Sequence, residues 1–126
     1  MKATYSKKEK LKSKILIEKL FSEGKSVSSF PLRMVFIGTE FDEEIKAKCG
    51  VSVSKRNFKK AVDRILIKRL MREAYRLNKN FYFNNITTQY ALMILYIGNE
   101  KPMFEQINKA MKILLERFVE KVSEEK

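Results

Sequence analysis

The stretch Tyr90–Ile97, YALMILYI, constrains the fold of this chain more than any other. All of its residues are apolar, and its length suits a β-strand but is far too short for a membrane-spanning helix. A strand without polar alternation is typical of positions that are covered on both faces. We therefore expect this stretch to form a central strand, buried on both faces of a sheet.

Three segments have the periodicity of amphipathic helices. Apolar residues recur at helical spacing in residues 11–21, 59–77 and 100–122. Gly24 follows the first segment and suits the end of a helix, and Pro102 suits the first turn of the last one. We expect three helices, each of which buries one apolar face.

Two further segments predict β-strands. Residues 30–38 have a β-rich composition, and apolar and polar side chains alternate in residues 46–55. Val51 and Ser52 therefore fall on opposite faces of the second strand. We expect these two strands to form an antiparallel pair. Residues 78–89 are polar and aromatic, and we expect a connector there.

Together these elements predict an α+β fold with the order α-β-β-α-β-α. The chain has 126 residues, which is enough for one domain with one modest core. We expect a single-domain α-β sandwich, in which helices pack on a small mixed sheet. The folded domain should span residues 11–122, between a flexible basic tail at 1–10 and a short C-terminal tail at 123–126.

The charge of the chain points to a polyanionic partner. Lys and Arg number 27 against 15 Asp and Glu, which gives a formal net charge of +12. A surplus of this size repels itself unless a polyanion meets it, and the common polyanions are nucleic acid and anionic membrane. The basic N-terminal residues are not followed by an apolar segment, so we expect a cytoplasmic protein.

The composition also removes the usual means of catalysis. Histidine, the commonest general base and metal ligand, is absent. Cys49 is the single cysteine, which excludes a disulfide or a thiolate zinc site within the chain and suits a small core residue. The acidic run Phe41–Glu44 is a candidate magnesium site, but carboxylates within one loop are usually just solvated. We expect neither catalytic residues nor a metal site on this chain.

The helix expected at residues 59–77 carries cations over roughly half of its circumference on a helical projection. These cations are Lys59, Lys60, Arg64, Lys68, Arg69, Arg72 and Arg76. The opposite arc is expected to face the core, and it contains Val62, Leu66, Ile67, Leu70, Ala74 and Leu77. We expect Glu73 to pair with Arg69, which leaves most of the basic arc without an acidic partner.

Such an arc has two explanations. Most charged helix faces are simply solvated. Here arginine is prominent beside lysine, and its planar guanidinium suits phosphate groups. The arc also continues into Lys55 and Arg56 at the end of the preceding strand. Because a continuous strip of cations can follow a phosphate backbone, we favour nucleic acid over a solvated surface.

The segment Gly50–Arg76, GVSVSKRNFKKAVDRILIKRLMREAYR, also resembles the signature of the bacterial ribonuclease P protein subunit. In that family a strand ending in Ser-Val-Ser-Lys-Lys/Arg runs into a helix with Ala-Val-x-Arg-Asn-Arg-x-Lys-Arg-x-x-Arg-Glu. The matching residues here are Ser52, Val53, Ser54, Lys55, Arg56, Ala61, Val62, Arg64, Lys68, Arg69, Arg72 and Glu73. Leu20–Val27, LFSEGKSV, resembles the end of the first helix of the family and its glycine turn.

This chain departs from the signature at the Asn-Arg pair, which is replaced by Ile65 and Leu66. Leu66 falls on the arc expected to face the core, so packing would fill that position. Ile65 falls within the basic arc, so a contact made there by the family's asparagine would be absent or replaced.

The resemblance implies a definite function and fold. Ribonuclease P removes the 5′ leader from precursor tRNA by phosphodiester hydrolysis. Its RNA subunit is the catalyst, and Mg²⁺ is held mainly by that RNA and the substrate. The family fold has a left-handed β-α-β crossover, although general topology rules favour the right-handed form.

The resemblance also implies two sets of binding residues. The ribonuclease P RNA subunit would bind to Lys55, Arg56, Lys59, Lys60, Arg64, Lys68, Arg69, Arg72 and Arg76. The leader of precursor tRNA would lie in a cleft between the first helix and the sheet, lined by Ile17, Phe21, Arg33 and Val35. From the residues alone, Ile17, Phe21 and Val35 suit the core equally well.

Three other classes of protein share some of these features. A basic ribosomal or general RNA-binding protein would have a similar size and charge. A helix-turn-helix DNA-binding protein needs two short helices joined by a tight turn, whereas a strand precedes the basic helix here. A membrane-surface helix would expose bulky apolar side chains, which we expect to be buried. We therefore expect RNA partners, and neither DNA nor a membrane.

Overall fold

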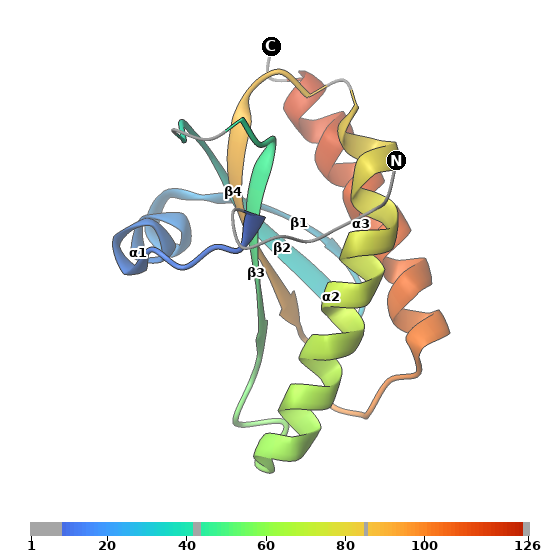
Figure 1. Cartoon of the computed structure of the whole chain (residues 1–126). Helices are drawn as coiled ribbons and strands as arrows, with labels where there is room; N and C mark the ends of the chain where they lie inside the picture. The colour runs from blue at the N-terminus through green and yellow to red at the C-terminus, as the bar shows by residue number, and fades with distance from the viewer. Residues whose placement is uncertain (1–8, 42–43, 85, 125–126) are drawn as a thin grey trace.

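A computed structural model describes residues 9–41, 44–84 and 86–124 of the chain (Figure 1). In chain order its elements are α1 (Lys14–Glu23), β1 (Lys25–Ser29), β2 (Leu32–Thr39), β3 (Ala47–Val53), α2 (Ala61–Phe83), β4 (Gln89–Tyr96) and α3 (Phe104–Glu124). The α+β class and the expected order are confirmed, with the short strand β1 as an addition. Its sequence, KSVSS, contains a single apolar residue and gives no strand pattern.

The four strands form one sheet in the order β1-β2-β4-β3. β2 runs antiparallel to both β1 and β4, whereas β3 runs parallel to β4. The predicted pairing of β2 with β3 is therefore wrong, because β4 lies between them. β4 is the most apolar strand, and the inner position buries both of its faces. The parallel pair β3 and β4 is joined through α2, and the left-handed winding of this crossover stays a prediction.

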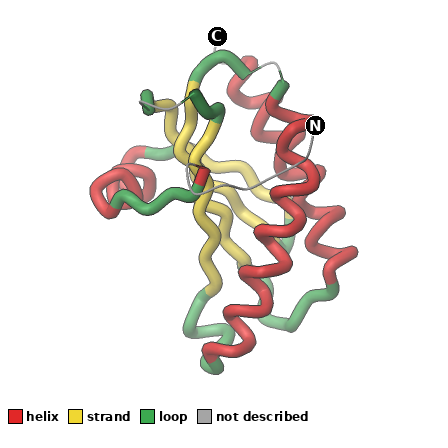
Figure 2. The backbone as a smooth tube through the Cα atoms, in the orientation of Figure 1, coloured by secondary structure: helices red, strands yellow, loops and turns green. Residues whose placement is uncertain are grey.

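Helices cover both faces of the sheet (Figures 1 and 2). α2 and α3 pack side by side on one face, and α1 lies on the other. Alternate residues of β4 point into two separate cores: Leu92 and Ile94 pack under α2 and α3, whereas Ala91 and Met93 pack under α1. The prediction that β4 is buried on both faces is thus confirmed.

The folded part of the chain begins before the expected boundary at residue 11. The backbone N–H of Leu11 donates to the carbonyl of Cys49 at 3.1 Å, and Lys10 forms a β-bridge with Cys49. Glu9 forms an ion pair with the buried Lys79 of α2. At the other end, α3 continues to Glu124, two residues into the expected tail. Residues 1–8 of the expected basic tail lie outside the described part.

α2 is longer than predicted, because the aromatic residues at its C-terminal end take part in the core. Phe83 is buried, and its ring lies 5.8 Å from that of Phe118 and 6.1 Å from that of Tyr75. The Lys46 ammonium donates to the carbonyl groups of Phe83 and Asn84 at 2.8 Å, which places a cation at the negative end of the helix. The connector predicted for residues 78–89 therefore begins only after Phe83.

The buried face of α2 also differs from the prediction. Ile67 and Ala74 are buried as expected, but the expected core residues Val62, Leu66 and Leu77 are exposed. The buried positions include Met71, Tyr75 and the polar Asn78, so the true core arc is turned by about a quarter of a turn from the apolar arc. Asn78 fits there because its amide donates to the Ala74 carbonyl and to Asn108 Oδ1, both at 2.7 Å.

Candidate nucleic-acid interface

The turn between β3 and α2 is held in one conformation by its own hydrogen bonds. The carbonyl of Ser54 accepts from the N–H of Phe58 at 3.1 Å, and the Ser54 hydroxyl accepts from the N–H of Arg56 at 3.1 Å. Phe58 is buried, with its ring 5.8 Å from that of Tyr96. The exposed cations of this turn, Lys55, Arg56, Lys59 and Lys60, therefore stand on a fixed backbone.

The loop between β4 and α3 reinforces this turn and the start of α2 through two contacts. The amide of Asn57 donates to the carbonyl of Gly98 at 3.3 Å. At the start of α2, Asp63 forms an ion pair with Lys101 at 3.0 Å, which draws one of the two acidic groups of the helix away from its basic face. The β4–α3 connection thus supports the turn without covering its cations.

Arg64, predicted to contact RNA, is turned toward its own backbone. Its Nη1 atom donates to the carbonyl of Phe58 at 2.7 Å and to that of Lys59 at 2.9 Å. The side chain is half-buried, and the two N–H groups on Nη1 allow it to serve two neighbouring carbonyl groups. Arg64 therefore holds the turn on which the exposed cations stand.

The remaining predicted cations of α2 divide into two groups. Arg69 and Arg72 are exposed and Lys68 is half-buried, and these three have no acidic partner among the described residues. Arg76 instead donates from Nη2 to Glu73 Oε1 at 2.5 Å. This hydrogen bond lowers the pKa of the Glu73 carboxyl. The predicted pairing of Glu73 with Arg69 is wrong, because Glu73 pairs with Arg76, which lies one turn closer to the C-terminus.

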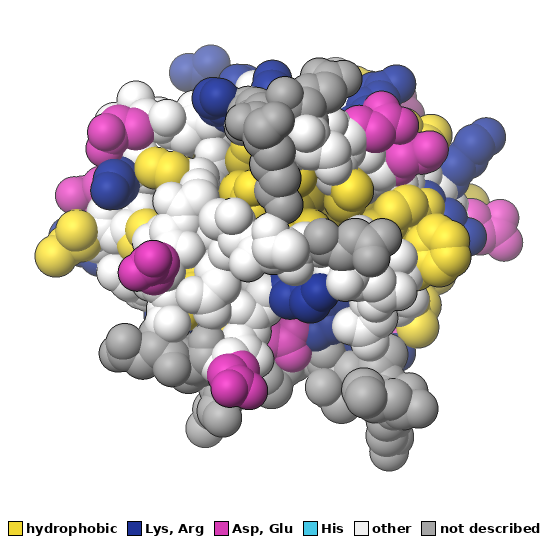
Figure 3. Space-filling view, turned by 90° about the horizontal axis from the view of Figure 1, so that it is seen from above, with side chains coloured by type: hydrophobic (Ala, Val, Ile, Leu, Met, Phe, Trp, Pro, Cys, Tyr) yellow, Lys and Arg dark blue, Asp and Glu magenta, His cyan; other side chains and the backbone are white. Residues whose placement is uncertain are grey.

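The other end of the molecule has a different character. Figure 3 looks onto the end at which α2 and α3 finish and β4 begins. Acidic side chains are scattered there among basic and apolar ones, and the visible described surface has no continuous patch of one sign. The cations of the turn and of the first half of α2 lie toward the opposite end. The exposed cations Lys55, Arg56, Lys59 and Lys60 thus lie together at the N-terminal end of α2.

The sheet face beside α1 gives a second candidate surface. Strand register places Ser28, Arg33, Leu95 and Ser52 in one row across the sheet. Arg33 is exposed and donates from Nη2 to Ser26 Oγ at 3.4 Å. Ser52 and Leu95 were not among the residues predicted to line the cleft. For Ser52 the signal was present, because it alternates with the core residues of β3.

The four residues predicted to line a leader cleft are placed differently from one another. Val35 is buried in the small core under α1, together with Leu20, so it does not contribute to the accessible surface. Ile17 is half-buried and packs against the same core. Phe21 is 52% exposed on the last turns of α1. Phe21 and Arg33 are therefore the accessible members of the set.

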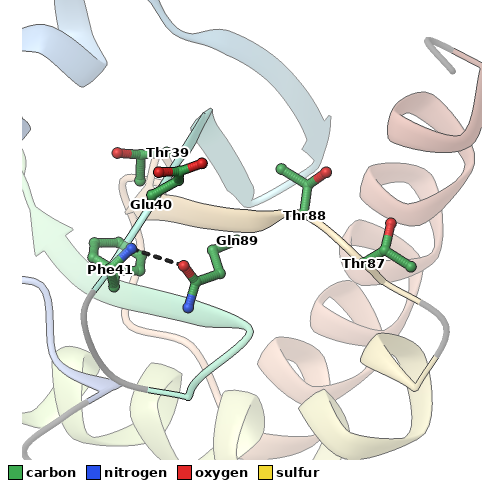
Figure 4. Close-up of a pocket in the computed structure, with 6 residues that line it drawn as sticks. All are labelled: Thr39, Glu40, Phe41, Thr87, Thr88 and Gln89. Atoms are coloured by element: carbon green, nitrogen blue, oxygen red, sulfur yellow. Dashed lines mark hydrogen bonds between the residues drawn. The ribbon is translucent and has the colours of Figure 1, made fainter.

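A pocket of about 390 Å³ lies elsewhere, where β2 ends and β4 begins (Figure 4). Its lining residues are Thr39, Glu40, Phe41, Thr87, Thr88 and Gln89. The N–H of Phe41 donates to Gln89 Oε1 at 2.7 Å, so Gln89 mainly holds the loop that follows β2. Because this lining has a carboxylate and no cation, it does not suit a phosphate group.

The sequence predicted that Cys49 is a core residue and that the acidic run Phe41–Glu44 is not a metal site. Cys49 is buried, and burial raises the pKa of its thiol, which disfavours a reactive thiolate and confirms its place in the core. Asp42 and Glu43 of the acidic run lie outside the described residues. Within the described ranges, no three His, Cys, Asp or Glu side chains gather as a metal site. None of the helices described is long and apolar enough to span a membrane.

Comparison with known proteins identifies the family. The Ribonuclease P family profile matches residues 5–119. The ribonuclease P protein component of Porphyromonas gingivalis is 38% identical over 111 residues, which cover 84% of this chain and 80% of that protein. The corresponding protein of Chlorobium phaeobacteroides is 35% identical over 124 residues, which cover 86% of this chain and 84% of that protein.

Solved structures of the same family share the fold. The RNase P protein of Staphylococcus aureus superposes with a TM-score of 0.68 at 20% identity, over 87% of this chain and 94% of that one. The RNase P protein of Thermotoga maritima superposes with a TM-score of 0.65 at 24% identity, over 86% of this chain and 96% of that one. The chain therefore belongs to the bacterial ribonuclease P protein family and takes part in RNA processing.

Proposed function

We propose that this chain is the protein subunit of ribonuclease P, which binds the catalytic RNA subunit and the 5′ leader of precursor tRNA in the bacterial cytoplasm. The observation that carries the proposal is the fixed turn before α2, which holds Lys55, Arg56, Lys59 and Lys60 in line with the cations of the helix. A rigid basic strip binds a phosphate backbone without first losing conformational freedom.

Within this proposal the cations have different tasks. Those of the turn, together with Lys68, Arg69 and Arg72, contact phosphates of the RNA subunit. Arg64 supports them through the carbonyl groups of Phe58 and Lys59. Arg76 shares its guanidinium with Glu73, so its contribution to RNA binding is smaller than that of Arg69.

The leader lies on the sheet face beside α1. Phe21 offers an exposed ring for stacking on a base, and Arg33 offers a cation on the row formed with Leu95 and Ser52. Single-stranded RNA is commonly held by such a combination of cations and stacking surfaces. Ile17 forms the edge of this surface, and Val35 supports it from below.

The chemistry belongs to the RNA subunit in this proposal. The chain has no histidine, and its single cysteine is a buried core residue. The described acidic groups do not form a metal site, so we place the Mg²⁺ ions on the RNA and the substrate. The protein then contributes binding and positioning.

The direct test is precursor-tRNA cleavage by a bacterial ribonuclease P RNA at low Mg²⁺ concentration, with and without this protein, beside the protein alone. We expect stimulation in the presence of the RNA and no cleavage by the protein alone. Tight RNA binding without stimulation would support a general RNA-binding protein instead. Cleavage by the protein alone would overturn the assignment of the chemistry to RNA.

The leader assignment needs a separate measurement. Phe21→Ala should weaken binding of precursor tRNA to the holoenzyme by about tenfold, since base stacking on an aromatic ring contributes about 1–3 kcal/mol. Binding of mature tRNA, which has no leader, should not change. Equal losses for the two tRNAs would remove Phe21 from the leader site.

A further inference from the structure

The first turns of α2 expose an apolar patch in the middle of the basic strip. Val62 is 71% exposed, Ile65 53% and Leu66 48%. These positions are spaced i, i+3 and i+4, so the three side chains lie together on one face of the helix. Large aliphatic side chains are more often buried, and a cluster of them on a positively charged surface indicates a binding partner.

The patch cannot turn inward, because the opposite face of the helix is locked in the core. Ile67 is 1% exposed, and Met71 and Ala74 are fully buried. Rotating α2 to bury Leu66 would bring these residues into water. The patch is therefore a permanent feature of the surface and not the result of a loosely packed helix.

The surroundings of the patch restrict its partner. Lys59 and Lys60 precede it, and Arg69 lies one turn beyond it. The nearby acid, Asp63, is engaged by Lys101. A suitable partner must present an apolar surface surrounded by negative charge. A second copy of this chain does not fit, because two basic strips on chains of charge +12 would repel each other.

RNA fits both requirements. The face of an unpaired nucleobase is apolar and flat, and phosphates flank it on either side. We propose that Val62, Ile65 and Leu66 pack against an unpaired base of the ribonuclease P RNA subunit while the neighbouring cations bind the adjoining phosphates. This inference rests on the proposed function and adds a nonionic contact to its ionic ones. A helix with apolar and basic residues also suits an anionic membrane, which the test must separate.

The first test compares two double variants of the same helix. Ile65→Gln with Leu66→Gln should weaken binding to ribonuclease P RNA by about tenfold at every salt concentration, because it removes apolar contact without removing charge. The slope of log affinity against log salt should stay as in the wild type. The control, Leu77→Gln with Phe81→Gln, changes two exposed apolar residues further along α2 and should not alter binding.

Failure of this inference can be distinguished from failure of the proposed function. If the wild-type protein does not bind the RNA subunit, the proposed function fails. If the wild type binds and the patch variant binds equally well, the RNA contact at the patch is refuted while the proposed function stands. A loss of the same size in the control variant would also refute a local contact.

The second test uses the absence of tryptophan from the chain. In Leu66→Trp the new indole is the sole tryptophan, and stacking on a base should quench its emission when ribonuclease P RNA is added. Unchanged emission on saturation with RNA would refute the contact. A blue shift and a gain in intensity with vesicles of anionic phospholipid, without quenching by RNA, would assign the patch to a membrane instead.

Discussion

Arg64 belongs to a basic helix, but its contacts stabilise the protein's own backbone and do not face a ligand. Its two hydrogen bonds fix the carbonyl groups of Phe58 and Lys59 at the end of the turn. Arg64→Ala leaves both carbonyls without this donor and should lower the free energy of unfolding by about 1–2 kcal/mol. Arg69→Ala removes an exposed side chain and should lower it by less than about 0.5 kcal/mol. Urea denaturation of the two variants measures the difference.

The conservative variant separates support from direct contact at the same residue. Arg64→Lys keeps the charge, but its ammonium lies one atom closer to the backbone than Nη1 and should not reach both carbonyl groups, so it should weaken RNA binding without reducing the salt slope. Arg69→Gln should reduce that slope by about 0.9, as expected for one lost phosphate contact. Wild-type stability of Arg64→Ala, together with wild-type RNA binding by Arg64→Lys, would contradict the supporting role of Arg64.

At the scale of elements, the sequence predicted secondary structure correctly where a single hydrophobic pattern was sufficient. The unbroken apolar run of β4 predicted a strand buried on both faces, and the spacing in α3 predicted a helix. β1 escaped prediction because a hairpin partner, β2, holds it through backbone hydrogen bonds. The face of α2 was misassigned because apolar side chains occur on two arcs of the helix, and only the arc with Met71 and Tyr75 packs in the core.

The same limit applies to strand pairing and to the candidate site. Nothing in β2 or β3 alone records that β4 inserts between them, because the pairing depends on how α2 crosses the sheet. The cations of the turn were predicted from charge spacing, and all four are exposed. The role of Arg64 and the burial of Val35 depend on three-dimensional contacts and could not be predicted from the sequence.

The close approach of α1 to the sheet depends on Gly24. A Cβ atom at this position would lie 2.3 Å from the Leu20 carbonyl oxygen and 2.9 Å from Val35 Cγ1. Gly24→Ala should therefore push α1 from the sheet and lower the free energy of unfolding by about 1–3 kcal/mol. Gly38→Ala is the control, since the nearest atoms there are 3.7 Å away. Equal urea midpoints for the two variants would contradict the close packing of α1.

The C-terminal end of α2 depends on Lys46. Its ammonium serves three carbonyl groups, those of Phe83, Asn84 and Ile86, at 2.8, 2.8 and 3.4 Å. Lys46→Met should lower the free energy of unfolding by about 1–2 kcal/mol and speed amide hydrogen exchange in the last turn of α2. Lys112→Met on the exposed side of α3 should change neither quantity. Unchanged exchange in Lys46→Met would show that water caps the helix equally well.

At the scale of the whole molecule, RNA binding could depend on the net charge or on where the cations are placed, and the two alternatives predict different effects of mutation. A net charge of +12 attracts any polyanion, whereas a strip along the turn and α2 gives a defined phosphate-binding surface. Seven cations in this region have no acidic partner among the described residues: Lys55, Arg56, Lys59, Lys60, Lys68, Arg69 and Arg72. If all of them contact phosphates, the salt slope of RNA binding should lie between about −5 and −6.

Two double variants with the same net charge decide between these alternatives. Arg69→Gln with Arg72→Gln removes two cations from the strip, and Lys109→Gln with Lys112→Gln removes two from the exposed side of α3. The first pair should reduce the salt slope of binding to ribonuclease P RNA by about 2, and the second should leave it unchanged. Equal reductions would mean that the RNA responds to the overall charge of the molecule. The placement of cations on α2 would then have no special part in assembly, and the interface would have to be sought elsewhere.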